Sequence, residues 1–357
     1  MATPSRNPSL RRARERRGAD VRYDFGSDNT AGLAPPALEA LIAANTGPAP
    51  AYGRDDITAR AADVIRQRLD ADAEVRFVFS GTAGNAIALS MLAWPYEAVL
   101  AHHAAHVCTD ETGAPGFFGQ GMGLIGLPGF SGKIEEAALL AALEEPEVGH
   151  RQPAAALSLS QSTEYGTVYT VDEMRRLIEP AKARGMGVHL DGARLANAAA
   201  AGFDLTQIAR LGVDLLVFGG AKAGASCVEA VVMFDRSLAR RIDNRLKQAG
   251  QTASKGRFLV APLLGLLESG AWETGAAHAN LMAARLAEGI VAGTPFVLAH
   301  PVEANTVFVR MSEAAHARLT AAGWACYRFD DGSVRFVCSW ATAEQAVDEL
   351  LAAMRTV

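Results

Sequence analysis

Residues 187–234 decide the fold class, and they read GVHLDGARLANAAAAGFDLTQIARLGVDLLVFGGAKAGASCVEAVVMF. Three short apolar segments in this stretch are predicted strands: Gly187–Leu190, Val213–Phe218 and Val228–Phe234. Runs this short and this apolar are typical of strands that are buried on both faces of a sheet. The stretch therefore predicts the middle of a covered sheet.

The same alternation extends toward the N-terminus. Glu74–Phe79 and Ala154–Ser158 are further predicted strands, and Ala83–Leu92 and Val171–Ala183 are predicted helices. Strands that alternate with helices form βαβ units, in which the strands run parallel. We therefore expect an α/β fold with a large, mostly parallel sheet that helices cover on both faces.

The pattern changes near residue 265. Ala304–Met311 is a predicted strand, and Cys326–Phe329 and Val334–Cys338 form a predicted hairpin around an Asp-Gly turn. Consecutive strands joined by a tight turn are antiparallel, unlike those of the preceding part. This end of the chain is therefore predicted to be a separate α+β unit.

A last helix is predicted to start at Thr342, where Gln345 stands at the position that completes a capping box. The chain then divides into three predicted regions: a disordered tail over 1–22, a large domain over 23–265, and a smaller α+β domain over 266–357. The tail is rich in arginine and lacks the apolar core of a secretory signal, so we expect it to be removable.

The composition of the 357 residues argues against several classes of protein. A formal net charge of −5 provides no basic field that would recruit nucleic acid. No apolar run reaches the length of a membrane span, and we expect a cytoplasmic location. The four cysteines form no CxxC pair and have no zinc-site spacing, so we expect neither a metal nor a disulfide: Cys108, Cys227, Cys326 and Cys338.

The turn after Val213–Phe218 is the most informative feature for chemistry. It reads FGGAKAG over residues 218–224 and places Lys222 among glycines at the end of a predicted strand. Desolvation at such a position lowers the pKa of a lysine, so that its amine can attack an aldehyde. The alternative is a loop lysine that contacts a phosphate without covalent chemistry.

Asp191 and Arg194 follow the strand Gly187–Leu190 in the block HLDGAR. A carboxylate at a strand end can hold a protonated pyridine nitrogen and so keep the ring an electron sink. The planar fork of an arginine suits a substrate carboxylate. The alternative is an N-cap aspartate beside a surface arginine.

Two further motifs fall at the same predicted edge of the sheet. The motif SGTAGN, residues 80–85, joins a strand to a helix, where glycines and a helix N-terminus favour a phosphate. An ordinary tight turn with an N-cap is the alternative there. His106 is placed to stack on a flat cofactor, or else it is a structural histidine. Ligand sites of α/β folds form at the carboxyl ends of strands, so we expect one site from all these motifs.

The order of these motifs resembles that of the low-specificity L-threonine aldolases. That family consists of pyridoxal phosphate enzymes with the aspartate aminotransferase fold, fold type I. The resemblance runs from about Tyr23 to the C-terminus. It is carried by these stretches: Ala51-Tyr52-Gly53, Ser80-Gly81-Thr82, Ala105-His106-Val107, Asp110-Glu111, Gly113-Ala114-Pro115, Gly166-Thr167-Val168-Tyr169, Asp191-Gly192-Ala193-Arg194, Lys222, Lys247-Gln248-Ala249-Gly250 and Arg335-Phe336-Val337-Cys338-Ser339-Trp340.

The resemblance implies a cofactor, pyridoxal 5'-phosphate, and the residues that hold it. Lys222 would form a Schiff base with the cofactor, Asp191 would pair with the pyridine nitrogen, and His106 would stack on the ring. Gly81 and Thr82 would hold the phosphate.

The resemblance also implies how the substrate is bound. Ser27, Arg194 and Arg335 would bind the carboxylate of an amino acid, and Arg194 would lie beside the cofactor as well. Tyr52 is implied in substrate binding and Lys247 in cofactor binding, both across a subunit interface. We therefore expect a homodimer or homotetramer with active sites at the dimer interface.

The reaction implied is retro-aldol cleavage of L-threonine or L-allo-threonine to glycine and an aldehyde. The β-hydroxyl must lose a proton, so a general base is needed, and His106, Glu164 or an ordered water are the candidates. Ala221 departs from the family, whose members usually carry Ser or Thr before the lysine. The alternatives on the same scaffold are a phenylserine-type aldolase, a β-eliminating lyase, or a pyridoxal phosphate-binding protein with little turnover.

Overall fold

The computed structural model describes residues 21–145, 148–329 and 331–357. The predicted disordered tail over 1–22 therefore lies almost wholly outside the described residues. Arg22 is described, and its backbone N–H donates to the carbonyl of Gly323 at 2.8 Å. In this part of the chain, no helix is long and apolar enough to cross a membrane.

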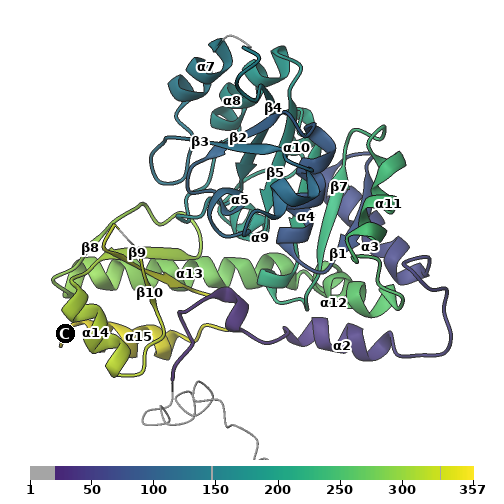
Figure 1. Cartoon of the computed structure of the whole chain (residues 1–357). Coiled ribbons are helices and arrows are strands. Elements are labelled where there is room, and N and C mark those ends of the chain that lie inside the picture. Colours follow the sequence, from purple (N-terminus) through teal and green to yellow (C-terminus); the bar gives the residue numbers. More distant parts are fainter. Residues whose placement is uncertain (1–20, 146–147, 330) are drawn as a thin grey trace, which may run out of the picture.

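A seven-stranded sheet forms the centre of the larger part of the molecule (Figure 1), in the order β1-β7-β6-β5-β4-β2-β3. β7 is antiparallel to both of its neighbours, and the other pairs are parallel. The predicted mostly parallel sheet is thereby confirmed. Its strands are β1 (Glu74–Val78), β2 (Ala98–His102), β3 (Gly123–Leu127), β4 (Ala154–Ser160), β5 (Gly187–Gly192), β6 (Leu215–Gly219) and β7 (Glu229–Met233).

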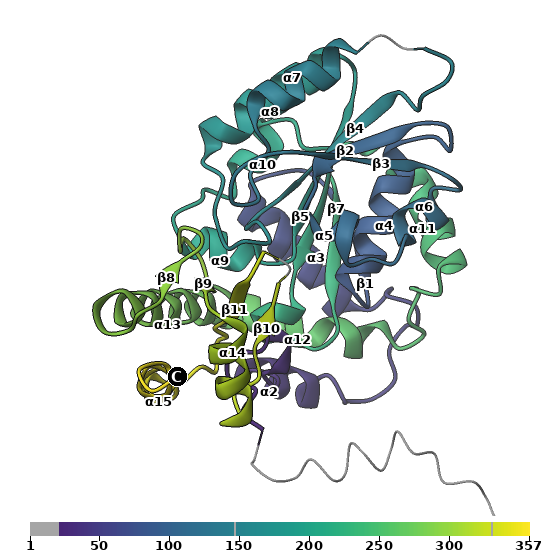
Figure 2. The same ribbon diagram turned by 60° about the vertical axis from the view of Figure 1, so that its left-hand side comes forward.

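Helices cover both faces of this sheet. Figure 2 shows α4, α6 and α11 on one side of the sheet, and α7, α8 and α10 on the other. Every residue of β2, β6 and β7 is buried, which explains why these strands are continuously apolar apart from a few polar positions. The helices of this part are α2 (Pro35–Ala43), α3 (Asp56–Leu69), α4 (Gly81–Leu92), α5 (His106–Thr109), α6 (Ala114–Phe118), α7 (Glu136–Glu144), α8 (Val171–Ala183), α9 (Leu195–Ala200), α10 (Gln207–Arg210), α11 (Ala239–Gln248) and α12 (Gly256–Ser269).

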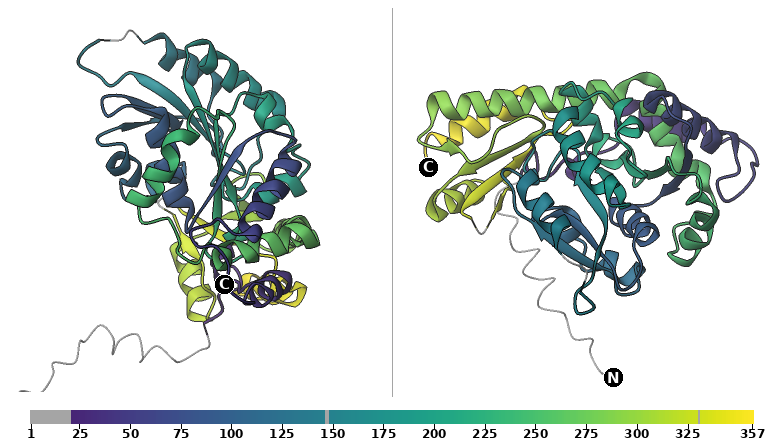
Figure 3. Two further views of the ribbon diagram at one scale, coloured as in Figure 1. Left: turned by 90° about the vertical axis from the view of Figure 1, so that its right-hand side faces the viewer. Right: turned by 90° about the horizontal axis from the view of Figure 1, so that it is seen from above.

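The C-terminal part, coloured light green to yellow in Figure 3, contains a four-stranded antiparallel sheet. Its strand order is β10-β11-β9-β8, and the antiparallel pairing of β10 with β11 confirms the predicted hairpin. Phe336 is fully buried between this sheet and its helices, whereas Phe308, on the other face of β9, is buried against Tyr165 and His300. The elements are the long α13 (Ala271–Gly293), β8 (Val297–Leu298), β9 (Thr306–Arg310), α14 (Glu313–Ala321), β10 (Tyr327–Arg328), β11 (Ser333–Val337) and α15 (Glu344–Met354).

The predicted start of the last helix is wrong. α15 begins at Glu344 with Ala343 as its N-cap and has no side-chain capping bond, so Gln345 completes no capping box. The hydroxyl of Thr342 instead accepts the backbone N–H of Ser339 at 2.8 Å. A turn before the helix has therefore taken the hydroxyl that the sequence pattern assigned to the cap.

Two apolar clusters meet along α13. Trp272 and Ala276 pack in the cluster of the large sheet, whereas Met282 and Leu286 pack in the cluster of the small sheet. Phe25, close to the N-terminal end of the described chain, also packs in the second cluster. A segment from before the large sheet thus lies against the C-terminal part, and it brings residues 27–30 between the two sheets.

Candidate active site

The predicted site forms where β5 and β6 end. Asp191 on β5 is paired in register with Val217 of the neighbouring parallel strand β6. The turn that carries Lys222 begins at Ala221, two positions after β6 ends at Gly219. Parallel neighbours present their carboxyl ends at one edge of a sheet. Asp191 and Lys222 therefore belong to the same centre, although 31 positions separate them in the chain.

The turn under Lys222 is held by hydrogen bonds from outside it. The backbone N–H of Gly220 donates to Glu229 Oε2 at 2.6 Å, and the indole N–H of Trp272 donates to the carbonyl of Gly219 at 2.9 Å. A Cβ at Gly219 would lie 2.5 Å from the carbonyl oxygen of Ala193, so only glycine allows the two strand ends to pack this closely. Lys222 itself is half-buried at the start of a 3₁₀ turn.

Asp191 is a buried carboxylate whose two oxygens each accept a hydrogen bond. Its Oδ2 accepts a hydrogen bond from Asn85 Nδ2 at 2.8 Å, and its Oδ1 accepts the backbone N–H of Ala193 at 2.9 Å. Burial opposes ionisation, but the positive charge of Lys222 and these hydrogen bonds hold the pKa of Asp191 below its ordinary value. Asp191 therefore stays anionic at the end of β5.

His106 belongs to the same hydrogen-bonded network. Its Nδ1 lies 3.0 Å from Glu111 Oε1, and Asn85 Nδ2 donates to that same oxygen at 2.9 Å. The hydrogen bond to Glu111 raises the pKa of His106, and burial raises the pKa of Glu111. Because Nδ1 is engaged, Nε2 is the ring nitrogen that is left for a ligand.

We expect Glu111→Gln to lower the pKa of His106, because a neutral amide replaces the carboxylate that favours the imidazolium. The shift would be about one unit by the usual size of such charge effects. NMR titration of the imidazole in the unmodified protein and in the variant measures the shift. An unchanged titration of His106 would contradict the assigned hydrogen bond.

Arg194 is fully buried and paired with an aspartate of its own chain. Its Nε donates to Asp28 Oδ2 at 2.7 Å and its Nη2 donates to Asp28 Oδ1 at 3.0 Å. Asn305 Nδ2 donates to the same Oδ2 at 3.1 Å. The structure thus uses two nitrogens of the guanidinium internally, and among the described residues Nη1 has no hydrogen-bond partner. The predicted contact with a substrate carboxylate falls to that nitrogen.

Arg335 lies on β11 and brings the C-terminal part into the site. Burial and the like charge of Arg194 lower the pKa of Arg335, while the charge of Glu164 opposes this shift. Its guanidinium lies 5.5 Å from the ring centre of Phe329, and its Nε has no hydrogen-bond partner among the described residues. Two neighbouring guanidinium groups with free donors suit a carboxylate ligand.

Glu164 and Ser27 lie at the margin of the same centre. The charge of Glu164 acts on His106, Arg194 and Arg335, so this carboxylate lies near all three. Ser27 caps the 3₁₀ turn η1 (Asp28–Thr30), where its Oγ accepts the N–H of Asn29 at 3.2 Å. It therefore directly precedes the aspartate that holds Arg194.

The start of α4 carries Gly81 and Thr82. Ser80 caps this helix by accepting the N–H of Ala83 at 3.3 Å, and a Cβ at Gly81 would meet no atom within 4 Å. A helix N-terminus that opens into free space is a ready site for a phosphate. With Lys222, a buried anionic Asp191 and the ring of His106, these residues fit a phosphorylated aromatic aldehyde.

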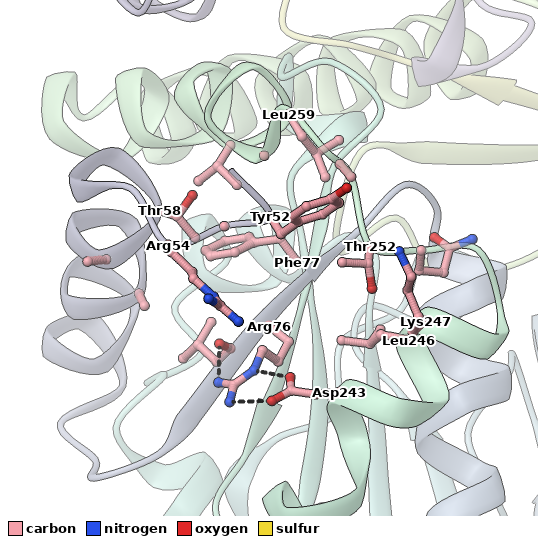
Figure 4. Close-up of a pocket in the computed structure, with 18 of the residues that line it drawn as sticks. Tyr52, Arg54, Thr58, Arg76, Phe77, Asp243, Leu246, Lys247, Thr252 and Leu259 are labelled. Carbon is pink, nitrogen blue, oxygen red and sulfur yellow. Dashed lines mark hydrogen bonds and ion pairs between the residues drawn. The ribbon is translucent and has the colours of Figure 1, made fainter. Parts of the chain in front are cut away.

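Tyr52 and Lys247 lie at a different place, over a cavity of about 580 Å³ between β1, α3, α11 and α12 (Figure 4). The Lys247 ammonium is 5.0 Å from the ring centre of Tyr52, and both side chains are exposed. Among the described residues, neither side chain forms a hydrogen bond or ion pair to the site around Lys222. One chain alone therefore does not join these two predicted residues to the rest.

Sequence reasoning missed five polar residues that support the site. Most of them stood inside or beside quoted motifs, and the signal for Glu229 was an acidic residue within an otherwise apolar strand. A buried carboxyl in such a strand must find a partner, which points to a role. The five are Asp28, Asn85, Glu111, Glu229 and Asn305.

This sheet, with a lysine and an aspartate at neighbouring strand ends and a helix N-terminus beside them, defines the pyridoxal phosphate-dependent enzymes of fold type I. Solved structures agree on the fold: an aspartate aminotransferase of Thermus thermophilus superimposes with a TM-score of 0.74 at 17% identity, covering 99% of this chain and 97% of that chain.

The chain belongs to the beta-eliminating lyase family, whose model matches residues 24–314. It is 45% identical to the low specificity L-threonine aldolase of Pseudomonas sp. (strain NCIMB 10558) over 95% of this chain and 99% of that protein. The threonine aldolase of Leishmania major has 31% identity and a TM-score of 0.88, covering 94% of this chain and 99% of the other. These matches confirm the resemblance to the threonine aldolases.

Proposed function

We propose that this protein is a pyridoxal phosphate-dependent aldolase that cleaves L-threonine or L-allo-threonine to glycine and acetaldehyde. The observation that carries the proposal is the meeting of Lys222, Asp191 and His106 with the pair Arg194 and Arg335. Two relatives, 45% and 44% identical and each matched over 99% of its length, carry the name low specificity L-threonine aldolase.

The cofactor would be held covalently by Lys222, with Asp191 at its ring nitrogen, His106 against its ring face and its phosphate at the start of α4. When bound, pyridoxal phosphate supplies an electron sink for the pair of electrons released at the substrate Cα. Asp191 serves this purpose because it stays anionic in a buried place, with a pKa below its ordinary value. Asn85 and Ala193 orient it for that contact.

Binding of the amino acid falls to the two arginines. Arg335 offers an unpartnered Nε and Arg194 offers Nη1, and together they can hold both oxygens of one carboxylate. When the carboxylate is held at two points, the substrate cannot turn about the bond between Cα and its amino nitrogen. The bond from Cα to Cβ therefore keeps one direction relative to the cofactor plane. The contribution of these arginines is therefore orientation.

Cleavage also requires a proton acceptor for the β-hydroxyl. His106 Nε2 and the Glu164 carboxylate both belong to the centre in which the arginines lie. Glu111 holds the opposite ring nitrogen of His106 and so fixes which nitrogen faces the substrate. His106 and Glu164 therefore remain the two protein candidates for the base.

The active unit in this proposal is at least a dimer. Tyr52 and Lys247 are exposed and unconnected to the site of their own chain, which supports a role in the site of a second copy. The described cysteines are all free, which supports a reducing compartment such as the cytoplasm.

We expect the purified protein, loaded with pyridoxal phosphate, to release glycine and acetaldehyde from L-allo-threonine in equal amounts. Coupled reduction of acetaldehyde and quantification of glycine measure the two products. Release of 2-oxobutyrate and ammonia would instead identify a β-eliminating lyase. Turnover of phenylserine to benzaldehyde with no acetaldehyde from either threonine isomer would move the assignment to an aldolase for aromatic substrates.

A further inference from the structure

Glu229 is a buried carboxyl that the proposed chemistry leaves without a task. It lies on β7 opposite Gly219 of β6 and Val78 of β1, and its residue is 3% exposed. Its Oε2 accepts the backbone N–H of Gly220 at 2.6 Å. Withdrawing a carboxyl from water at the start of an otherwise apolar strand costs free energy, so this position requires an explanation.

The hydrogen bond from Gly220 lies at the start of the turn that carries Lys222. Gly220 is the N-cap of η2 (Ala221–Ala223) and has no side chain with which to cap it, and Ala221 brings no hydroxyl. The backbone N–H of Ala221 also faces the Glu229 carboxyl and lowers its pKa. Glu229 therefore caps this turn from the neighbouring strand, at the point where the backbone positions the lysine.

Glu229 is also coupled to the charge of that lysine. The pKa of Glu229 is raised to about 7, because burial outweighs the bond from Gly220 and the charge of Lys222, which lower it, and the charge of Asp191 adds to the rise. The residue that faces it from β1, Val78, is uncharged. When Lys222 loses its proton, the carboxyl loses its main favourable charge and takes up a proton more readily.

We propose that Glu229 is a positioning residue for Lys222: it caps the turn beneath the lysine and balances the lysine's charge by exchanging its own proton. This inference rests on the proposed role of Lys222 in holding pyridoxal phosphate. The charge of the carboxylate is opposite to that of the lysine, and protonation of the carboxyl removes this counter-charge when the amine reacts with an aldehyde.

The test uses covalent uptake of pyridoxal phosphate by the cofactor-free protein. Uptake is followed by absorbance between pH 5.5 and 9 and counted by mass after borohydride reduction. In Glu229→Gln the amide keeps the bond from Gly220 but loses the charge, so we expect the midpoint of the uptake rate to move to lower pH by roughly one unit. In Glu229→Leu the cap is lost as well, and uptake should slow about tenfold at every pH.

Glu97→Gln is the matched control. Its carboxylate also accepts a backbone N–H at 2.6 Å, from Trp94, but it directly precedes β2, which three strands separate from β7. Its uptake midpoint should equal that of the unmodified protein. A Glu229→Gln protein that takes up the cofactor with the unmodified midpoint overturns the proposal.

A second measurement, the free energy of unfolding as a function of pH, does not require Glu229→Gln to fold. Since the folded pKa of about 7 exceeds the ordinary 4.5, the folded cofactor-free protein binds an extra proton between these values, and stability falls as pH rises through that window. Lys222→Met removes the favourable charge, so the window should move to higher pH. An unmoved window overturns the proposal.

The two proposals fail in different ways. If the unmodified protein takes up no pyridoxal phosphate on Lys222, the proposed function fails. Only the role of Glu229 fails if the unmodified protein takes up the cofactor and cleaves threonine, while Glu229→Gln leaves the pH midpoint of uptake unchanged and Lys222→Met leaves the pH window of stability unchanged.

Discussion

Replacing Lys222 with alanine is expected to reduce acetaldehyde release from L-allo-threonine by about three orders of magnitude or more, because a group that forms a covalent bond has no substitute nearby. Only five lysines occur in the chain, and Lys222 is the one within the network of Asp191 and Glu229. The same variant should lose the absorbance band of lysine-bound pyridoxal phosphate. Steady-state rates and the absorption spectrum together measure the effect.

Lys182→Ala provides the control for this change. Lys182 is an exposed lysine whose ammonium pairs with Asp214 at 2.8 Å on the outside of the molecule. Exposed ion pairs contribute about 0–1 kcal/mol, so activity and spectrum should be retained. Acetaldehyde release by Lys222→Ala at a rate near that of Lys182→Ala would exclude the covalent role of Lys222.

Replacing Arg194 with methionine is expected to lower the free energy of unfolding by about 3–5 kcal/mol, the usual cost of leaving a buried charge without its partner. Asp28 is 3% exposed, and Arg194 and Asn305 are its side-chain hydrogen-bond partners in the described structure. Burial works against the charge of Asp28, but Arg194 holds the pKa of Asp28 below its ordinary value of 3.8. Urea unfolding of the cofactor-free protein measures the difference.

The sign of the pH effect follows from that lowered pKa. The stabilisation by the pair is complete above pH 3.8 and is lost as the pH falls through the folded pKa of Asp28. The double variant Asp28→Asn with Arg194→Met removes both charges and should recover most of the lost stability. If the double variant is as unstable as the sum of the single changes, the two residues do not act as a pair.

Local sequence was sufficient to predict the sheet and the residues of the central motifs. Val213–Phe218 and Val228–Phe234 are apolar at nearly every position because both faces of β6 and β7 are covered, so burial is written directly into the residue types. The glycine at position 219, near Lys222, also follows directly from the packing, because Gly219 lies so close to the backbone of Ala193 that no side chain fits there. The placement of Lys222 and Asp191 at adjacent strand ends followed from the same pattern.

Tertiary structure alone decided the partners of these residues. Asp28 and Arg194 are separated by 166 positions, and Glu229 reaches Gly220 only because β7 turns back antiparallel to β6. A hydrogen bond of this kind depends on where two distant backbones cross, and no short-range pattern of residue types records that distance. The start of the last helix shows the same limit on a smaller scale, since the hydroxyl of Thr342 accepts the N–H of Ser339 and does not cap the helix as predicted.

The sequence by itself therefore determined the fold class and the motifs that stand at the strand ends, Lys222 and Asp191 among them, because those depend on burial and on local backbone conformation. Only the tertiary structure decided that Arg194 shares its guanidinium with Asp28 and that Glu111 orients His106. The physical reason is that charge and hydrogen-bond partners are chosen by distance in space. That distance is set by how the two apolar clusters pack along α13.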